Sequence, residues 1–223
     1  MRIVILLLLI NSFHLSAQNT QGPARWASTI QKFEIVDSKE QPPTDAILFV
    51  GSSSIVKWET MGKDLAGHEV INRGFGGSTF NDLIYYADRV IYPYQPKAVF
   101  VYEGDNDISV GDTPKEVLKS AKKLRKMIAK NLGGDVPVVF ISPKPSLARW
   151  ELKTQYEAAN ARLRSFAGKN KNTYYVDVWT PSLQENGAVR DDIFIGDNLH
   201  LNAAGYDIWE AAIKPMVKLL DKL

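Results

Sequence analysis

The sequence of 223 residues contains no cysteine. This absence excludes disulfide bonds, cysteine-ligated zinc, iron–sulfur clusters and a cysteine nucleophile. An excess of one charge is also lacking, because 27 Lys and Arg residues stand against 25 Asp and Glu, a formal net charge of +2. A general nucleic-acid-binding protein would carry a basic excess, so we expect no nucleic-acid partner. The composition, 45% apolar and 23% charged, is that of a globular domain rather than a disordered chain.

No apolar run approaches the length of about 20 residues that a bilayer-spanning helix needs. The run from Ile3 to Ile10 follows the positive Arg2 and precedes the small residues of Leu15-Ser16-Ala17. This pattern predicts a cleaved signal peptide over residues 1–17 and a single mature domain over residues 18–223. We therefore expect a secreted or periplasmic protein without stable membrane insertion; an uncleaved membrane anchor is the alternative interpretation.

Five short apolar runs alternate with helical patterns along the remaining chain. Because the runs are apolar on both faces and rich in β-branched residues, they predict strands of a buried parallel sheet. The predicted strands span residues 46–50, 68–72, 97–102, 136–141 and 173–178. The predicted helices span residues 24–36, 114–132, 149–166 and 202 to the C-terminus. The alternation predicts a doubly wound α/β fold with helices on both faces of the sheet.

Polar segments follow three of the predicted strands, and a fourth precedes the last helix. They span residues 51–55, 72–79, 103–107 and 197–200. Ligands of doubly wound sheets bind at the carboxyl ends of the strands. Acyl transfer needs a serine at a sharp turn, a histidine to accept its proton, a carboxylate to orient the histidine and donors for the oxyanion. A serine after the first strand, Asp197 with His200, the glycine-rich segment and the Asn106 amide could supply these groups.

The same segments carry a resemblance to a known family. Phe49–Ser54, Gly77, Gly104–Asp107 and Asp197–His200 resemble, in order, the sequence blocks of the SGNH, or GDSL-type, serine hydrolases. The surrounding sequence is similar to platelet-activating-factor acetylhydrolase-like and lysophospholipase-like members. The resemblance implies that Ser53 is the nucleophile, His200 the general base and Asp197 its orienting partner. It also implies an oxyanion hole made by the backbone N–H groups of Ser53 and Gly77 and the side-chain amide of Asn106.

One position departs from the family pattern. Ser52 stands where the usual Gly-Asp-Ser motif has its aspartate, so three serines occur in a row. The assignment of the nucleophile to Ser53 therefore depends on register, with Ser52 and Ser54 as the alternatives. The departure also leaves open which group forms hydrogen bonds to the loop at this position.

Each motif also has an interpretation without catalysis. A serine of residues 51–54 could cap the next helix, and Gly74–Gly77 could be a tight turn. The glycines are not followed by the lysine of a phosphate-binding loop, and Thr79 stands where a dinucleotide-binding pattern needs glycine. Asp197 could cap the last helix, with His200 as a structural hydrogen-bonding residue.

Other polar residues have simple structural explanations. The segment from Asp105 to Glu116 has the spacing of a calcium-binding loop, but Val110 stands at the position where such a loop requires glycine. Glu116 is also predicted to form a helix capping box with Thr113. Asp105 and Asp107 then become solvated loop acids, and His68 is structural or exposed. Ser146, Arg149 and Trp150 could either line the cleft or begin a helix whose tryptophan packs in the core.

We therefore expect a flavodoxin-like three-layer α/β/α sandwich with a five-stranded parallel sheet. The expected activity is hydrolysis of carboxylic esters through a Ser-His-Asp triad and an acyl-enzyme, without a metal or an organic cofactor. The expected substrates are small-molecule or carbohydrate esters with short acyl groups, acetyl above all. Lysophospholipase or thioesterase activity is the alternative within the class, and a non-catalytic glycan-binding domain is the alternative outside it.

Overall fold

The computed structural model describes residues 22–222, so the predicted signal peptide lies outside the described residues. Five parallel strands form one sheet in the order β2-β1-β3-β4-β5. The strands are β1 (Ile47–Gly51), β2 (Val70–Gly74), β3 (Ala98–Tyr102), β4 (Val138–Ile141) and β5 (Thr173–Val176). This is the strand order of flavodoxin-like folds, and it confirms the predicted sheet. Pro137 immediately precedes β4, as expected for a residue that lacks a backbone N–H.

Two apolar cores lie on opposite faces of the sheet because successive side chains of a strand point to opposite sides. In β1, Leu48 and Val50 enter one core, whereas Ile47 and Phe49 enter the other. All five residues of β1 are buried. Burial on both faces explains why the strands are continuous apolar runs in the sequence.

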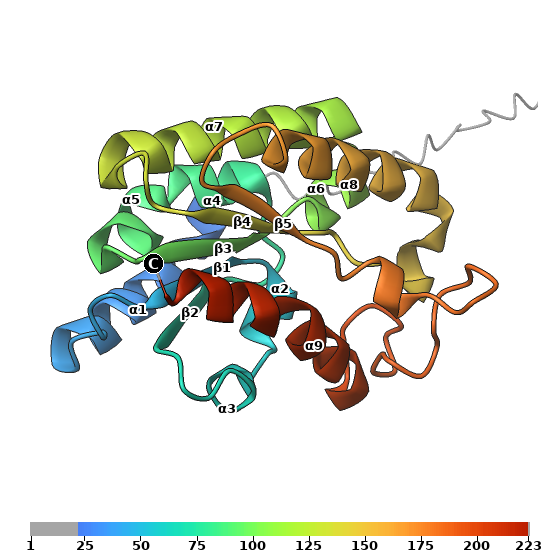
Figure 1. Ribbon diagram of the computed structural model, residues 1–223, viewed down its shortest axis with the longest axis horizontal. Helices are drawn as coiled ribbons and strands as arrows, with labels where there is room; N and C mark the ends of the chain where they lie inside the picture. Colours follow the sequence, from blue (N-terminus) through green and yellow to red (C-terminus); the bar gives the residue numbers. More distant parts are fainter. Residues whose placement is uncertain (1–21, 223) are drawn as a thin grey trace, which may run out of the picture.

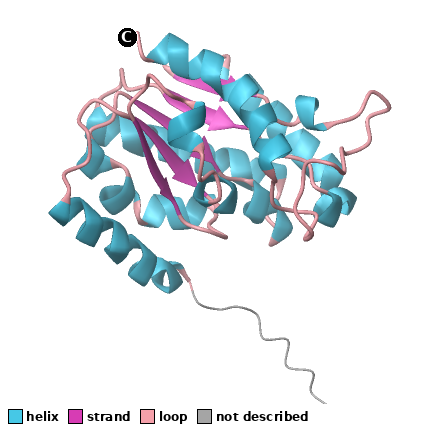
Figure 2. Cartoon of the chain, turned by 90° about the horizontal axis from the view of Figure 1, so that it is seen from below, coloured by secondary structure: helices cyan, strands magenta, loops and turns pink. Residues whose placement is uncertain are grey.

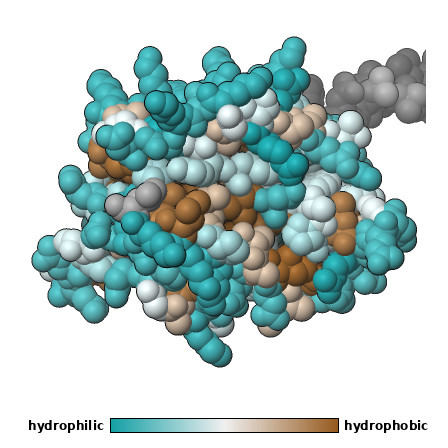
Figure 3. All heavy atoms as spheres, in the orientation of Figure 1, coloured by the Kyte–Doolittle hydropathy of each residue, from teal (hydrophilic) through white to brown (hydrophobic). Residues whose placement is uncertain are grey.

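Helices cover both faces and complete the three-layer sandwich (Figures 1 and 2). On the first core pack α1 (Ala27–Lys39), α4 (Phe80–Tyr85), α5 (Ala87–Val90), α7 (Pro114–Leu132) and α8 (Lys153–Ala167). On the second pack α2 (Ser53–Val56), α3 (Met61–Asp64) and α9 (Ala203–Leu220). The short α6 (Asp105–Ser109) follows β3, and the 3₁₀ turns are η1 (Pro23–Trp26), η2 (Tyr92–Tyr94), η3 (Leu147–Leu152) and η4 (Thr180–Ser182). The surface in the view of Figure 3 is mainly hydrophilic, with smaller hydrophobic patches between.

The start of α7 has the predicted capping box. Thr113 N–H donates to Glu116 Oε2 at 2.8 Å, and Glu116 N–H donates to Thr113 Oγ1 at 3.3 Å. The Glu116 carboxylate therefore caps the N-terminus of α7, which gives this residue a structural role that does not involve calcium. Among residues 22–222, no group of three or more potential ligands is arranged to hold a metal ion.

Two helix ends differ from the sequence prediction. The first helix continues to Lys39, three residues beyond the predicted end at Val36. The predicted helix over residues 149–166 is wrong at its start, because residues 147–152 form a 3₁₀ turn and α8 begins only at Lys153. Arg149 breaks the regular path with a φ of −131°, and its side chain is held by partners outside the helix.

His68 has a structural role at the end of the sheet where the strands begin. Its Nδ1 lies 2.6 Å from Asp221 Oδ2, just beyond the end of α9, and Lys97 Nζ lies 2.5 Å from Asp221 Oδ1. His68 therefore joins the start of β2 to the C-terminal helix at the sheet edge opposite Ser53. Within residues 22–222, no helix is both long and apolar enough to cross a membrane.

Candidate active site

Ser53 lies at the N-terminus of α2, immediately after a close turn at the end of β1. Gly51 makes that turn with a φ of +136°, and a Cβ at this position would lie 2.1 Å from the Tyr102 carbonyl oxygen. Only glycine has both this conformation and room for the neighbouring strand. The turn brings Ser53 Oγ within 2.9 Å of His200 Nε2.

The histidine is held from its other side by a carboxylate. His200 Nδ1 lies 2.6 Å from Asp197 Oδ2. Asp197 Oδ1 also accepts the backbone N–H groups of Leu199 and His200, at 3.0 and 2.9 Å. Burial opposes ionisation of Asp197, but the hydrogen bonds from His200 and the backbone outweigh it and lower the carboxyl pKa. The side chains of Ser53, His200 and Asp197 thus form one continuous hydrogen-bonded chain.

The neighbouring serines have different surroundings. Ser52 and Ser54 are buried, 2% and 3% exposed. Ser52, which stands at the sequence position of the motif's aspartate, accepts a hydrogen bond at its Oγ from Asn106 Nδ2 at 2.6 Å. Among the described residues, Ser53 is the serine whose hydroxyl bonds to His200.

Three groups that could stabilise an oxyanion gather beside Ser53. The Gly76–Gly77 turn lies against it, because a Cβ on Gly76 would be 3.7 Å from Ser53 Cβ; Gly77 has a φ of +78°. Within residues 22–222, neither Ser53 N–H nor Gly77 N–H has a recorded protein acceptor. The Asn106 side-chain amide donates to Ser52 Oγ and, at 2.9 Å, to the Ser78 carbonyl oxygen. All five residues implied by the resemblance therefore meet at one edge of the sheet.

Sequence reasoning missed a buried ionic network behind Asn106. Arg149 donates to Asp105 Oδ1 at 2.6 Å and to Asn106 Oδ1 at 3.1 Å. Lys144 Nζ lies 3.5 Å from Asp105 Oδ2. Burial would raise the pKa of Asp105, but Lys144 and Arg149 reverse that effect and bring it to about 2. Asp105 is therefore a buried anion, and its interpretation as a solvated loop acid is wrong.

The sequence held only a weak signal for this network. From the sequence, the segment after β4 that contains Arg149 could either line the cleft or begin a helix. In the structure, the Arg149 guanidinium donates a hydrogen bond to Asn106 Oδ1. Trp150 lies in the η3 turn, where it is partly buried and stacks on Trp179 with ring centroids 6.1 Å apart. Ser146 is buried.

Asp107 and Glu103 are also buried rather than solvated. Asp107 accepts the N–H groups of Phe80 and Gly104, both at 2.9 Å, and burial raises its pKa to about 7. Glu103 accepts from Ser78 Oγ at 2.6 Å, and burial raises its pKa well above the ordinary value. These two carboxyl groups hold the loops that carry Asn106 and Ser78.

Comparison with known proteins identifies the family. A family model described as the GDSL-like lipase/acylhydrolase family matches residues 50–208. The chain belongs to this family. It is an ester hydrolase, as the sequence predicted. No curated protein matches the chain.

Solved structures show the same GDSL-type fold. A Streptococcus pneumonia protein described as a candidate platelet activating factor has a TM-score of 0.75 and 19% identity, covering 87% of this chain and 94% of that one. A GDSL-like lipase from Bacteroides thetaiotaomicron has a TM-score of 0.71 and 20% identity, covering 86% and 98%. A single-residue mutant of Axe2, an acetyl-xylooligosaccharide esterase from Geobacillus, has a TM-score of 0.62 and 14% identity, covering 79% and 96%.

Proposed function

We propose that this GDSL-like hydrolase cleaves carboxylic esters through an acyl-enzyme on Ser53. The hydrogen-bonded chain from Ser53 through His200 to Asp197 carries the proposal. Ser53 Oγ attacks the acyl carbon while His200 Nε2 takes the hydroxyl proton, and Asp197 stabilises the resulting imidazolium. The carbon–oxygen bond to the alcohol then breaks, and the alcohol leaves with the proton from His200. A water molecule, deprotonated by His200, hydrolyses the acyl-serine and restores the enzyme.

The oxyanion in this reaction is held by three donors. They are the backbone N–H groups of Ser53 and Gly77 and the Asn106 side-chain amide. The oxyanion accepts a hydrogen bond from the Asn106 Nδ2 group, either together with Ser52 Oγ or in its place. Loss of one such donor typically costs about 10²–10³ in rate.

A short acyl group, acetyl above all, is the proposed acid half of the substrate. Four cavities formed by the described residues are lined by other residues, and none of these four includes Ser53, Asp197 or His200. A long acyl chain would need an apolar cavity beside the nucleophile, whereas an acetyl group needs little space. An O-acetylated carbohydrate is the proposed alcohol half, since the structurally similar Axe2 is an acetyl-xylooligosaccharide esterase. Secretion, which rests on the Arg2 to Ala17 segment, would bring the enzyme to such substrates.

Substrate preference can be measured with one panel. The panel contains p-nitrophenyl acetate and butyrate, acetylated xylooligosaccharides, lysophosphatidylcholine and an acyl thioester. We expect the highest kcat/KM on the acetyl esters, with release of acetate from the oligosaccharides. Higher kcat/KM on lysophosphatidylcholine or the thioester would contradict the acetyl-carbohydrate proposal. A wild-type protein that hydrolyses no substrate and resists labelling by a fluorophosphonate would instead support a glycan-binding domain.

A further inference from the structure

The orientation of the Asn106 amide is determined by a neighbour that can only donate hydrogen bonds. Arg149 Nη2 lies 3.1 Å from Asn106 Oδ1. A guanidinium has five N–H donors and no acceptor, so it selects the amide oxygen and disfavours the flipped amide. The Nδ2 group is then directed toward Ser52 Oγ and the Ser78 carbonyl, on the side of Ser53.

Arg149 is itself firmly held. Its Nη1 donates to Asp105 Oδ1 at 2.6 Å, and the Asp105 carboxylate also accepts from Tyr102 and Tyr156 at 2.8 and 3.0 Å. Lys144 adds a second positive charge, and its side chain is only 1% exposed. A planar guanidinium can bridge Asp105 and Asn106 at once, which the single nitrogen of a lysine cannot do with the same geometry.

The same segment also contacts the loop that carries the acid and the base. Ala148 N–H donates to the Asn198 carbonyl oxygen at 3.1 Å, between Asp197 and His200 in sequence. The η3 turn therefore touches both halves of the site.

We propose that Arg149 is a positioning residue that fixes the Asn106 amide as an oxyanion donor. This inference rests on the proposed function of Ser53 and Asn106. Arg149 does not need to touch the substrate to act, since its effect passes through the amide.

The test is a double-mutant cycle between Arg149 and Asn106. Arg149→Lys keeps a positive charge near Asp105 but loses the bridge; we expect kcat to fall about 10–100-fold, with KM changed less than about threefold. Arg149→Met removes the charge as well and should reduce kcat at least as much. In an Asn106→Ala background, Arg149→Lys should cause less than about a twofold further loss, because the group it positions is gone. Circular dichroism melts establish that each variant is folded.

Three results distinguish failure of this inference from failure of the proposed function. If Ser53→Ala abolishes activity but Arg149→Lys has wild-type kcat, only the positioning role fails. Equal losses from Arg149→Lys in the wild-type and Asn106→Ala backgrounds would also overturn it, because they indicate a general structural effect. If Ser53→Ala retains activity, the proposed function itself fails.

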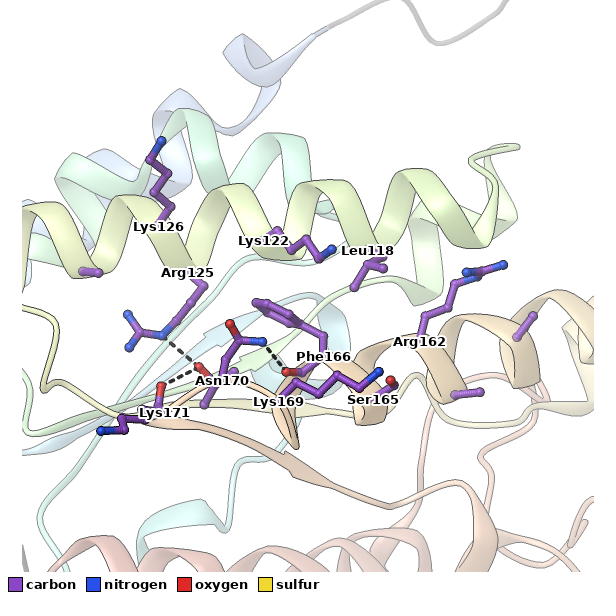
Figure 4. Close-up of a pocket in the computed structure, with 14 residues that line it drawn as sticks. Leu118, Lys122, Arg125, Lys126, Arg162, Ser165, Phe166, Lys169, Asn170 and Lys171 are labelled. Carbon is purple, nitrogen blue, oxygen red and sulfur yellow. Dashed lines mark hydrogen bonds between the residues drawn. The ribbon is translucent and has the colours of Figure 1, made fainter.

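A separate observation concerns the groove between α7 and α8, far from Ser53 along the sheet. It has a volume of about 1040 Å³, and Thr173, the first residue of β5, is among the residues that line it. Figure 4 draws the lining side chains. Six cationic residues line it: Lys122, Arg125, Lys126, Arg162, Lys169 and Lys171. No Asp or Glu lines the groove, and among residues 22–222 none of the six forms an ion pair with a carboxylate.

This charge is concentrated on a protein that is nearly neutral overall, with a net charge of +2. Its floor includes the half-buried Leu118 and Phe166, and Lys122 Nζ lies 5.7 Å from the Phe166 ring centre. The cations are spread over two helices and the following turn, more widely than one acidic head group can pair. The apolar side chains do not protrude, as insertion into a membrane would require.

We infer that the α7–α8 groove binds an anionic polysaccharide. Repeated carboxylates along a chain would match the spread of cations, and the apolar floor suits the C–H faces of sugar rings. Lys126 points away from α8, whereas Arg162 and Lys169 extend from the α8 side (Figure 4). Arg162 and Lys169 are exposed, so their reversal removes charge without disturbing the core.

The test uses fluorescein-labelled oligogalacturonate and fluorescence anisotropy. We expect binding that weakens as ionic strength rises to about 0.15 M and beyond, and no binding of neutral dextran. The Arg162→Glu/Lys169→Glu variant should bind at least about tenfold more weakly. The matched control, Lys39→Glu/Lys63→Glu, makes the same change in net charge at exposed residues of α1 and α3 and should bind as the wild type does.

Ester hydrolysis should be unchanged in both variants, because neither alters the candidate active site. If both variants bound the oligogalacturonate equally weakly, the loss would be an effect of net charge, and the assignment of the binding site to the groove would be wrong. Absence of binding by the wild type would overturn it as well. Tighter binding to phosphatidylglycerol vesicles or to duplex DNA would assign the surface to another class of partner.

Discussion

The Asn106 side-chain nitrogen lies 2.6 Å from the hydroxyl oxygen of Ser52, where the family motif has an aspartate. A hydroxyl thus supplies the acceptor for the loop at this position, which the sequence left open. Asn106 keeps two further partners, the Ser78 carbonyl and Arg149. The contribution of Ser52 is therefore one hydrogen bond among several.

Replacement of the serines one at a time tests which is the nucleophile. Ser53→Ala should lower kcat/KM by about 10⁴-fold or more, because no other hydroxyl bonds to His200 among the described residues. Ser52→Ala should lower it less than about tenfold, since Asn106 stays oriented. Hydrolysis of p-nitrophenyl acetate and labelling by a fluorophosphonate measure both effects. A larger loss from Ser52→Ala than from Ser53→Ala would mean that the register is wrong.

The carboxylate of Asp197 can be tested without a change of size. In Asp197→Asn, one amide geometry places an N–H donor against His200 Nδ1 and so favours the tautomer that cannot accept the Ser53 proton. We expect kcat to fall by about 10³–10⁴-fold, with little change in KM. Asp191→Asn, at an exposed residue outside the hydrogen-bonded chain, is the matched control and should keep wild-type kcat. A near-normal kcat for Asp197→Asn would remove Asp197 from the proposed mechanism.

The sheet could be predicted, as could the meeting of the five candidate site residues at one edge of it, because their signals are local. Continuous apolar runs mark strands buried on both faces, and the short blocks at the strand ends keep their order along the chain. The network of Asp105, Lys144 and Arg149 left no such signal. Its ion pairs join residues 39 and 44 positions apart, so they exist only once β3, β4 and the η3 turn are packed together. Helical periodicity alone predicted a helix that includes Arg149. In the structure Arg149 lies in the η3 turn, where it makes these contacts, and α8 begins after it.

Gly51 offers a test of the turn that presents Ser53. Gly51→Ala would place a methyl group 2.1 Å from the Tyr102 carbonyl oxygen, at a φ of +136°. Since the obstacle is backbone, we expect a loss of stability above about 3 kcal/mol and loss of esterase activity. Gly62→Ala is the matched control: nothing lies within 4 Å of the added Cβ, and the residue is in α3. That variant should melt at or slightly above the wild-type temperature, and a Gly51→Ala protein with normal melting and activity would contradict the strain argument.

Asp107 makes the stability of the fold depend on pH near neutrality. Burial raises its pKa from 3.8 to about 7, so between these values the folded protein holds a proton that the unfolded chain releases. The free energy of unfolding must then decrease as pH rises through this window, by roughly 4 kcal/mol at most. Glu103, whose pKa is also raised by burial, acts with the same sign. We expect Tm to drop between about pH 5 and pH 8, by on the order of 10 °C.

Asp107→Asn removes this titration and should flatten the dependence of Tm on pH. It should also lower Tm at every pH, because the amide nitrogen cannot accept one of the N–H groups of Phe80 and Gly104 that Asp107 now accepts. Asp88→Asn, at an exposed residue of α5, controls for the change in net charge and should keep the wild-type slope. The assignment to Asp107 is wrong if the variant and the wild type lose the same number of degrees over this range.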